Sequence, residues 1–249
     1  MSIIVKDFAS PAELDQTIFR YLKIEKFRSL LDRQAVWFCN LQKLQDEFEG
    51  VPPSPILSRM KAKDMEMKEW FPDEMRRAQF DQMTNRTIAD GKALTAVNCW
   101  YLSETESERM WDDYAGEDGV AVRSTIRSLS EALDPCGREP FPQLGRVKYV
   151  DFSTYDKLGL HELHRDFNLN FLKNQIFQYE QEVRIATLNL WHPQNGGIYW
   201  PSRLSTMIQQ VVLPPRADAS HRQRIQGLLD ACRLSVPIVD SSLALGAGE

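Results

Sequence analysis

The sequence predicts an α+β fold: a central mixed or antiparallel sheet, flanking helices and an inserted helical pair. Short β-type runs are mixed irregularly with helical segments, which is typical of α+β proteins rather than of regularly alternating α/β proteins. Apolar residues make up 43% of the chain and charged residues 26%, as in ordinary globular domains. We therefore expect a single domain over residues 1–242, a helical insertion at 57–90 and a flexible tail at 243–249.

The predicted helices follow from start signals and apolar spacing. Ser10 and Pro11 followed by Glu13 form a helix-start signal for one short turn. In the insertion at 57–90, methionines and aromatic residues supply the apolar positions, and Pro72 is expected to split the run into two helices. Helices are also expected at 24–33, 106–114, 125–133, 163–177 and 217–232.

The predicted strands are short runs of β-branched and aromatic residues between these helices. They are expected at 17–22, 36–39, 96–102, 119–123, 147–151, 183–188, 208–213 and 236–239. Segments rich in proline, glycine or polar residues predict a turn at 41–50, a loop at 134–145 and a turn at 193–197.

Composition argues against several classes of protein. No apolar run is long enough for a membrane helix, and we expect no signal peptide and no membrane partner. The formal net charge is −5 without an obvious basic patch, so nucleic acid is not expected as a partner. The four cysteines are far apart, which favours free thiols in a cytoplasmic protein. His161 and His164 lack a third ligand, and no metal is expected.

The most unusual segment, 98–122, contains two tryptophans and two tyrosines within 15 residues. On a helix over 106–114, Trp111 and Tyr114 lie three residues apart and share a face with Ser107. Such a face can form the floor of a pocket for a flat ring, because aromatic faces stack on flat partners. The alternative is that these aromatic residues are core and pack the helix onto the sheet.

Glu180 and Glu182 precede Arg184 in a β-type run. In a strand, the two acids point to the same face, where they repel each other and raise each other's pKa. Arg184 continues that face and is a candidate for the compensating cation. The alternative is an exposed edge strand with a simple Glu–Arg pair.

Arg20 lies between Phe19 and Tyr21 in a predicted strand, on the face opposite to theirs. A guanidinium in this position can bind a phosphate or carboxylate in bidentate fashion. An ordinary surface arginine is the alternative. Ser103 and Ser107 lack the sequence setting of a hydrolase nucleophile, so a serine hydrolase is not expected.

Motifs spread over about residues 15–242 resemble a widespread bacterial and phage family of domains of unknown function. Glu47 stands where the family pattern has proline. The matching residues are Phe19-Arg20-Tyr21, Asp46–Gly50, Cys99-Trp100, Glu106-Ser107, Met110-Trp111, Tyr114, Gly119-Val120-Ala121, Lys173, Tyr179, Glu180, Glu182, Arg184 and Ser241.

The order of these motifs also resembles the Arg–Ser–Glu class of ADP-ribosyltransferases, and it implies the same kind of fold. The resemblance implies NAD as a substrate, with one glutamate stabilising an oxocarbenium-like transition state and the preceding acid assisting the acceptor. It implies catalytic roles for Glu182 and Glu180, NAD binding by Arg20, Tyr21, Ser103, Ser107, Trp111 and Tyr114, and pocket positions for Trp100, Lys173 and Arg184.

Two functions remain open from the sequence. The first is an NAD-consuming transferase or glycohydrolase acting in defence or toxicity, which predicts that Arg20, Trp111 and Glu182 share one cleft. The second is a non-catalytic module that binds a nucleotide-like ligand or a protein. It predicts salt bridges from Glu180 and Glu182 to Arg20 or Arg184. The insertion at 57–90 is a candidate protein-binding surface.

Overall fold

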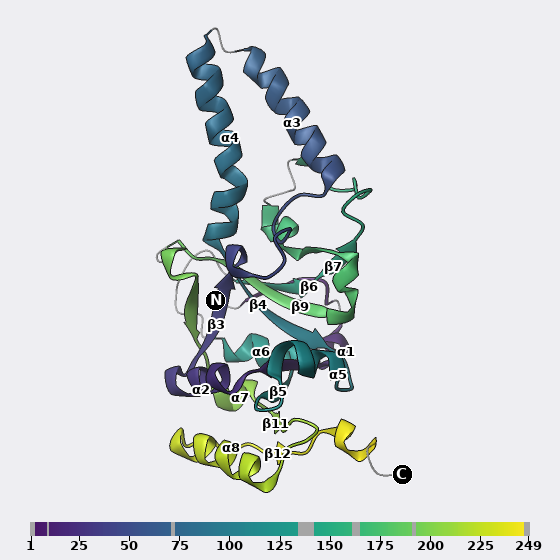
Figure 1. The fold of residues 1–249 in the computed structure, drawn as a ribbon, viewed down its shortest axis with the longest axis vertical. Coiled ribbons are helices and arrows are strands. Elements are labelled where there is room, and N and C mark those ends of the chain that lie inside the picture. Colours follow the sequence, from purple (N-terminus) through teal and green to yellow (C-terminus); the bar gives the residue numbers. More distant parts are fainter. Residues whose placement is uncertain are drawn as a thin grey trace.

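The computed structural model describes residues 3–8, 10–70, 73–133, 142–160, 165–190 and 193–246. As the sequence predicts, the fold is α+β, with helices flanking a large mixed sheet (Figure 1). The strands are β1 (Ile4–Val5), β2 (Thr17–Leu22), β3 (Ala35–Asn40), β4 (Thr95–Leu102), β5 (Val120–Thr125), β6 (Gln143–Arg146), β7 (Lys148–Val150), β8 (Leu172–Asn174), β9 (Glu182–Leu188), β10 (Gly197–Pro201), β11 (Gln210–Val212) and β12 (Ile238–Val239).

The helices vary in length from single turns to the long insertion. Their ends follow the expected signals: Ser10 and Glu13 form a capping box, and Asp218 caps the last long helix. The helical elements are α1 (Pro11–Leu14), α2 (Ile24–Arg33), η1 (Leu41–Lys43), α3 (Ser54–Glu69), α4 (Glu74–Leu94), α5 (Glu108–Met110), η2 (Trp111–Ala115), α6 (Ile126–Ala132), η4 (Arg165–Phe171), η5 (Gln175–Glu180), η6 (Pro193–Asn195), α7 (Leu204–Met207), α8 (Ala219–Ala231) and η7 (Ser242–Gly246).

The main sheet has the order β1-β6-β9-β4-β2-β5-β11-β12, and it is split beside β4. One edge of β4 bonds to β2 at Tyr101 and Leu102 and to β3 at Ala96 and Val97. Between these contacts, 98–100 have no strand partner on that edge within the described chain. β9 pairs with the other edge along nearly the whole of β4. In the gap between β2 and β3, the side chains of Arg20 and Asn98 both donate to the Trp37 carbonyl.

The two faces of the sheet carry different cores. One face packs aliphatic residues and Trp100 against α2, α6, α7 and α8. The other face carries an aromatic cluster, which consists of Phe19, Tyr21, Tyr101, Met110, Trp111, Ala115, Ala121 and Val212. Because residues alternate between faces along a strand, neighbours such as Trp100 and Tyr101 enter different cores. Glu182 lies directly opposite Tyr101 and so faces the aromatic side.

The insertion forms the expected pair of helices, α3 and α4, which project away from the sheet as a long hairpin (Figure 1). Ile56 at the base of α3 packs into a small separate core with Val150, Phe152 and Leu172. Beyond this base, the described side chains of both helices are mostly exposed. No helix in the described part of the chain is both long enough and apolar enough to span a membrane.

Two segments expected as a loop and a turn contain strands. β6 forms at the end of the predicted loop at 134–145, and β10 begins within the predicted turn at 193–197. The sequence of β6, Gln143–Arg146, has one aliphatic residue and a glycine, so it lacks a β-type pattern. Its conformation comes from pairing with β9 and β1, contacts that a local pattern cannot reveal.

The predicted helix at 163–177 is wrong over its described part. Residues 165–171 and 175–180 form 3₁₀ turns, and β8 between them pairs with β7. Burial of Leu169 and Leu172 against the base of α3 outweighs the helical pattern of the segment. His161 and His164 lie outside the described residues.

The C-terminal segment also differs from the expectation. Ser242–Gly246 forms the 3₁₀ turn η7, whereas a flexible tail is predicted from 243 onward. Leu243 packs against the aromatic cluster, which supplies the contact that orders this turn. Residues 247–249 lie outside the described residues.

Candidate functional site

Lys173 lies at the centre of a buried cluster of charged side chains. Its Nζ is 2.7 Å from Glu182 Oε1 and 3.1 Å from Glu49 Oε1, and it also donates to Glu180 Oε2. All four side chains are buried. A single ammonium therefore holds together three carboxylates that would otherwise repel one another.

Arg184 is the second cation of the cluster and has no exposed surface (0%). Its guanidinium donates to both oxygens of Glu49, at 2.9 and 3.0 Å, and to Glu182 Oε2 at 2.8 and 3.1 Å. It also donates to the Asn170 carbonyl at 2.7 Å. The expectation that Arg184 compensates Glu182 is met, and Glu49, which the sequence marks only as part of the motif at Asp46–Gly50, is a further partner.

The two glutamates reach Lys173 from different elements. Glu182 and Arg184 are alternate residues of β9 and share a face, as predicted. Glu180, expected in the same strand, is the last residue of η5. Gln181 between them has a left-handed backbone (φ 39°), and this reversal turns Glu180 toward the ammonium. The shared contact with Lys173 thus comes from a tight turn rather than from strand alternation.

The environment drives the pKa values of the two glutamates apart. Burial and the neighbouring Glu182 raise the pKa of Glu180 to about 7. Burial also acts to raise the pKa of Glu182, but Arg184 and Lys173 outweigh it and hold the pKa well below its usual range. Glu182 therefore stays ionised, whereas Glu180 changes protonation near neutral pH.

Tyr114 separates Glu180 from solvent. Its phenol donates a 2.6 Å hydrogen bond to Glu180 Oε1, while 39% of the residue is exposed. Tyr114 belongs to η2, a π-helical turn, and such turns are frequent at functional sites. Burial and the adjacent Glu180 raise the pKa of the phenol, so it remains a donor. Tyr114 is thus the outermost member of the cluster.

Trp111 belongs to the core rather than to an open pocket. It is 3% exposed, and its ring meets the edge of Tyr21 with centroids 5.1 Å apart. The indole Nε1 donates to Glu106 at 3.0 Å. The Tyr21 hydroxyl accepts the backbone N–H of Ser107 at 3.1 Å. Of the two interpretations open from the sequence, core packing describes Trp111 in this structure.

The two candidate serines cap local structure. Ser107 Oγ accepts the Met110 N–H at the start of α5, and Ser103 Oγ accepts the Thr105 N–H. Both are short-range contacts typical of caps and turns. Neither serine contacts the charged cluster in the described chain.

Arg20 lies apart from the cluster, in the gap between β2 and β3. Phe19, Tyr101 and Glu182 are paired across the sheet and point to the same face. Arg20 follows Phe19 in the strand, so its side chain points to the opposite face. Its guanidinium donates to the Trp37 carbonyl at 3.3 Å and forms no ion pair in the described chain. The expectation that Arg20, Trp111 and Glu182 share one cleft is therefore wrong for the described chain. The ion pair between Glu182 and Arg184 is the contact that the non-catalytic alternative predicts.

Arg20 and Trp100 instead form a second group. The guanidinium carbon lies 5.9 Å from the centre of the Trp100 ring, whose Nε1 donates to Asn98 at 2.7 Å. Burial lowers the pKa of Arg20 to about 10, an effect that the Cys99 and Cys39 thiols oppose. Trp100 is 2% exposed and packs in the aliphatic core, so it lines no opening beside the glutamates.

Cluster members that sequence reasoning missed come from distant segments. The Tyr149 hydroxyl accepts the Glu182 N–H at 2.8 Å. Burial raises the pKa of the nearby Cys99 thiol, and the charge of Glu182 raises it further. Glu49 had one signal, its place in the motif turn Asp46–Gly50, but nothing in that motif names its partner. Cys39 and Cys232 are free thiols as expected, and Cys136 lies outside the described residues.

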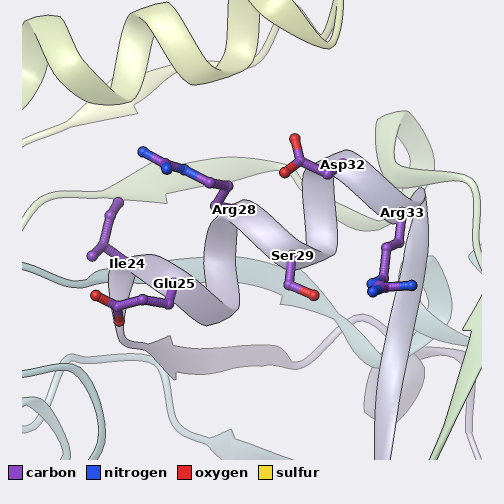
Figure 2. A pocket seen from close by; sticks show the side chains of 6 residues that line it. All are labelled: Ile24, Glu25, Arg28, Ser29, Asp32 and Arg33. Carbon is purple, nitrogen blue, oxygen red and sulfur yellow. The ribbon is translucent and has the colours of Figure 1, made fainter.

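Two surface hollows lie away from the charged cluster. Figure 2 shows one on the outer side of α2, lined by Ile24, Glu25, Arg28, Ser29, Asp32 and Arg33. Another lies between α8 and residues 236–238. Neither contains a residue of the charged cluster, and the first is a mostly charged face of a single helix. The cluster is therefore the stronger candidate site.

Comparison with known proteins finds no relative of this chain. The chain matches no protein-family model, no curated protein and no solved structure.

Proposed function

We propose that the chain is an acid–base enzyme in which Glu180 carries the proton and Glu182 remains a carboxylate. The observation that carries this proposal is the Lys173 ammonium shared by two glutamates whose pKa values are driven in opposite directions. Pairs of titratable groups with diverging pKa values commonly mark acid–base sites. The π-helical turn that places Tyr114 over Glu180 is a second, independent support.

We propose transfer of the ADP-ribosyl group of NAD, as the resemblance implies, to water or to another acceptor. The bond from the ribose C1′ to the nicotinamide nitrogen breaks, and nicotinamide leaves as a neutral molecule. The acceptor oxygen bonds to C1′ and gives its proton to Glu180. With Glu180 ionised, the cluster of Glu49, Glu180, Glu182, Lys173 and Arg184 carries one net negative charge. This charge favours a developing sugar cation.

Substrate contacts are assigned to the surface around Tyr114. Tyr179 is half-buried there, and the largely exposed Arg109 guanidinium lies 3.2 Å from the centre of its ring and 3.6 Å from Asp113 in an exposed ion pair. Aromatic rings beside a cation suit a nucleotide, which combines a flat base with phosphates. Arg20 is not retained as a phosphate contact, because its guanidinium is held in the gap between β2 and β3. Tyr114 must move aside for a substrate to reach Glu180.

The proposal is tested by incubating the purified chain with NAD and measuring free nicotinamide by chromatography. Release above the spontaneous rate is expected, together with a raised Tm in the presence of NAD, because binding to the folded state alone stabilises it. A chain that neither releases nicotinamide nor gains thermal stability with NAD would rule out this substrate.

A second candidate function, a protein-binding module, is supported by the hairpin of α3 and α4. Trp70 is 83% exposed, Met75 73% and Met65 70%, and large exposed apolar side chains are common at contact sites. The hairpin carries eight basic and seven acidic residues within a chain of net charge −5. The near-neutral hairpin gives little charge repulsion between two copies, which favours a second hairpin as the partner in a four-helix bundle.

Replacing Trp70 with serine tests this candidate. We expect the natural chain to form a concentration-dependent dimer in sedimentation velocity, and Trp70→Ser to remain monomeric because it removes the largest apolar contact. Leu190→Ser, at an exposed position outside the hairpin, is the matched control and should dimerise normally. A natural chain that stays monomeric at its highest soluble concentration excludes the bundle.

A further inference from the structure

Glu106 joins two separate parts of the chain. Its Oε2 accepts the Trp111 indole N–H at 3.0 Å and the Ser241 hydroxyl at 2.6 Å. Its Oε1 accepts the Ser242 backbone N–H at 2.7 Å and the Ser242 hydroxyl at 2.8 Å. Hydrogen bonds to an ionised carboxylate are among the stronger ones in proteins. One side chain thus connects the helical turn of Trp111 to the C-terminal segment.

The C-terminal segment is fixed at this point by burial as well. Ser241 is 2% exposed, and its hydroxyl oxygen also accepts the backbone N–H of Leu243. Leu243 packs against the aromatic cluster that contains Trp111. The segment Ser241–Leu243 therefore lies against the turn that leads to Tyr114, as a strap defined by these three residues.

The same turn carries the side chain that covers Glu180. α5 begins at the Ser107 cap, and Ser107 is itself bonded to Tyr21 of β2. Trp111 opens the π-helical turn and is held by Glu106. Three residues later, Tyr114 donates to Glu180. The path from the strap to the titrating glutamate thus runs through one continuous turn.

We infer that Glu106 is a positioning residue, which keeps Tyr114 over Glu180 by binding Trp111 and the strap. Its consequence for turnover rests on the proposed function. When the contact is loosened, the turn shifts, Tyr114 leaves Glu180 and water reaches the carboxyl. Because burial is the largest cause of the raised pKa, an uncovered Glu180 titrates closer to its ordinary value.

Loosening the turn also changes substrate binding. A substrate that needs Glu180 uncovered binds with an apparent affinity scaled by the fraction of molecules in the open state. Variants that open the turn are therefore expected to lower the KM for NAD by about 3–10-fold and to change kcat much less. A merely structural contact at Glu106 would lower the amount of folded protein and leave KM unchanged.

The test compares Glu106→Gln and the milder Ser241→Ala with Glu108→Gln, an exposed matched control two residues from Glu106. NMR of labelled tryptophan, tyrosine and glutamate follows the Trp111 indole, the Tyr114 ring and the titration of Glu180. We expect both test variants to shift the Trp111 and Tyr114 signals and to lower the pKa of Glu180, and the control to change neither.

The inference is overturned if both test variants keep the Tyr114 signal and the Glu180 titration of the natural chain, or if Glu108→Gln changes them equally. These NMR readouts do not depend on turnover. If the natural chain lacks NAD turnover while the signals shift as expected, the proposed function fails and the positioning role stands. Should Glu106→Gln fold poorly, Ser241→Ala alone decides, since it keeps the Glu106 carboxylate and removes only the two hydrogen bonds of the Ser241 hydroxyl.

Discussion

Replacing Arg184 with methionine is expected to lower the free energy of unfolding by about 3–5 kcal/mol. The guanidinium is fully buried and binds Glu49, Glu182 and the Asn170 carbonyl. Without it, two buried carboxylates depend on Lys173 alone, and an uncompensated buried charge is costly. Urea denaturation followed by circular dichroism measures the change.

Two further variants serve as controls for the stability effect of Arg184→Met. Arg127→Met removes an arginine of the exposed ion pair with Asp15, and its effect is expected to be much smaller. Combining Arg184→Met with Glu49→Gln removes one stranded charge, so part of the lost stability is expected to return. An Arg184→Met protein as stable as the Arg127→Met protein would show that the buried cluster contributes little to folding.

Glu180→Gln is expected to reduce NAD turnover by about 10²–10⁴-fold, the usual contribution of a general acid or base. Glutamine keeps the shape of the side chain but cannot take up the proton. The variant should remain folded, because Lys173 still contacts the carboxylates of Glu49 and Glu182. Steady-state release of nicotinamide, measured beside unfolding curves, separates lost chemistry from lost structure.

The matched variant Glu182→Gln distinguishes the two carboxylates. Glu182 is bound by both Lys173 and Arg184, so its loss is expected to destabilise the fold as well as the reaction. Glu117→Gln, at an exposed position, is the neutral control. If Glu180→Gln retains full turnover, the proton does not pass through this residue and the acid–base assignment is wrong.

Much of the fold follows from local patterns. The helix over Ile24–Arg33 is predicted by the spacing of its apolar residues, and Phe27, Leu30 and Leu31 are buried as that spacing implies. β6 and β10 escaped prediction because pairing with β9 and β3, rather than local composition, makes them strands. The 3₁₀ turn at 165–171 likewise depends on packing against the base of a distant hairpin.

The candidate site was predicted only in part, for the same reason. Alternation along β9 correctly placed Glu182 beside Arg184, whereas the left-handed Gln181 that turns Glu180 inward has no clear local signal. Glu49 lies 135 positions before Arg184, and only the folded chain brings the two together. Arg20 was expected at the site from motif order, but motif order carries no information about sheet register.

The pH dependence of the free energy of unfolding also reports on the titration of Glu180. The pKa of Glu180 is raised in the folded state, so between about pH 4.5 and 7 the folded chain binds more protons there than the unfolded chain. Its contribution to stability is therefore present at low pH and is lost as pH rises through 7. Glu182, whose pKa is lowered, contributes oppositely and loses its contribution as the solution becomes acidic.

The most direct test is carbon-13 NMR titration of the glutamate carboxyls in the folded protein, with Glu180→Gln and Glu182→Gln used to assign the two signals. The account predicts that Glu180 titrates with a pKa near 7 while Glu182 stays ionised throughout the neutral and mildly acidic range. Two glutamates that both titrate near the ordinary value of about 4.3 would contradict it.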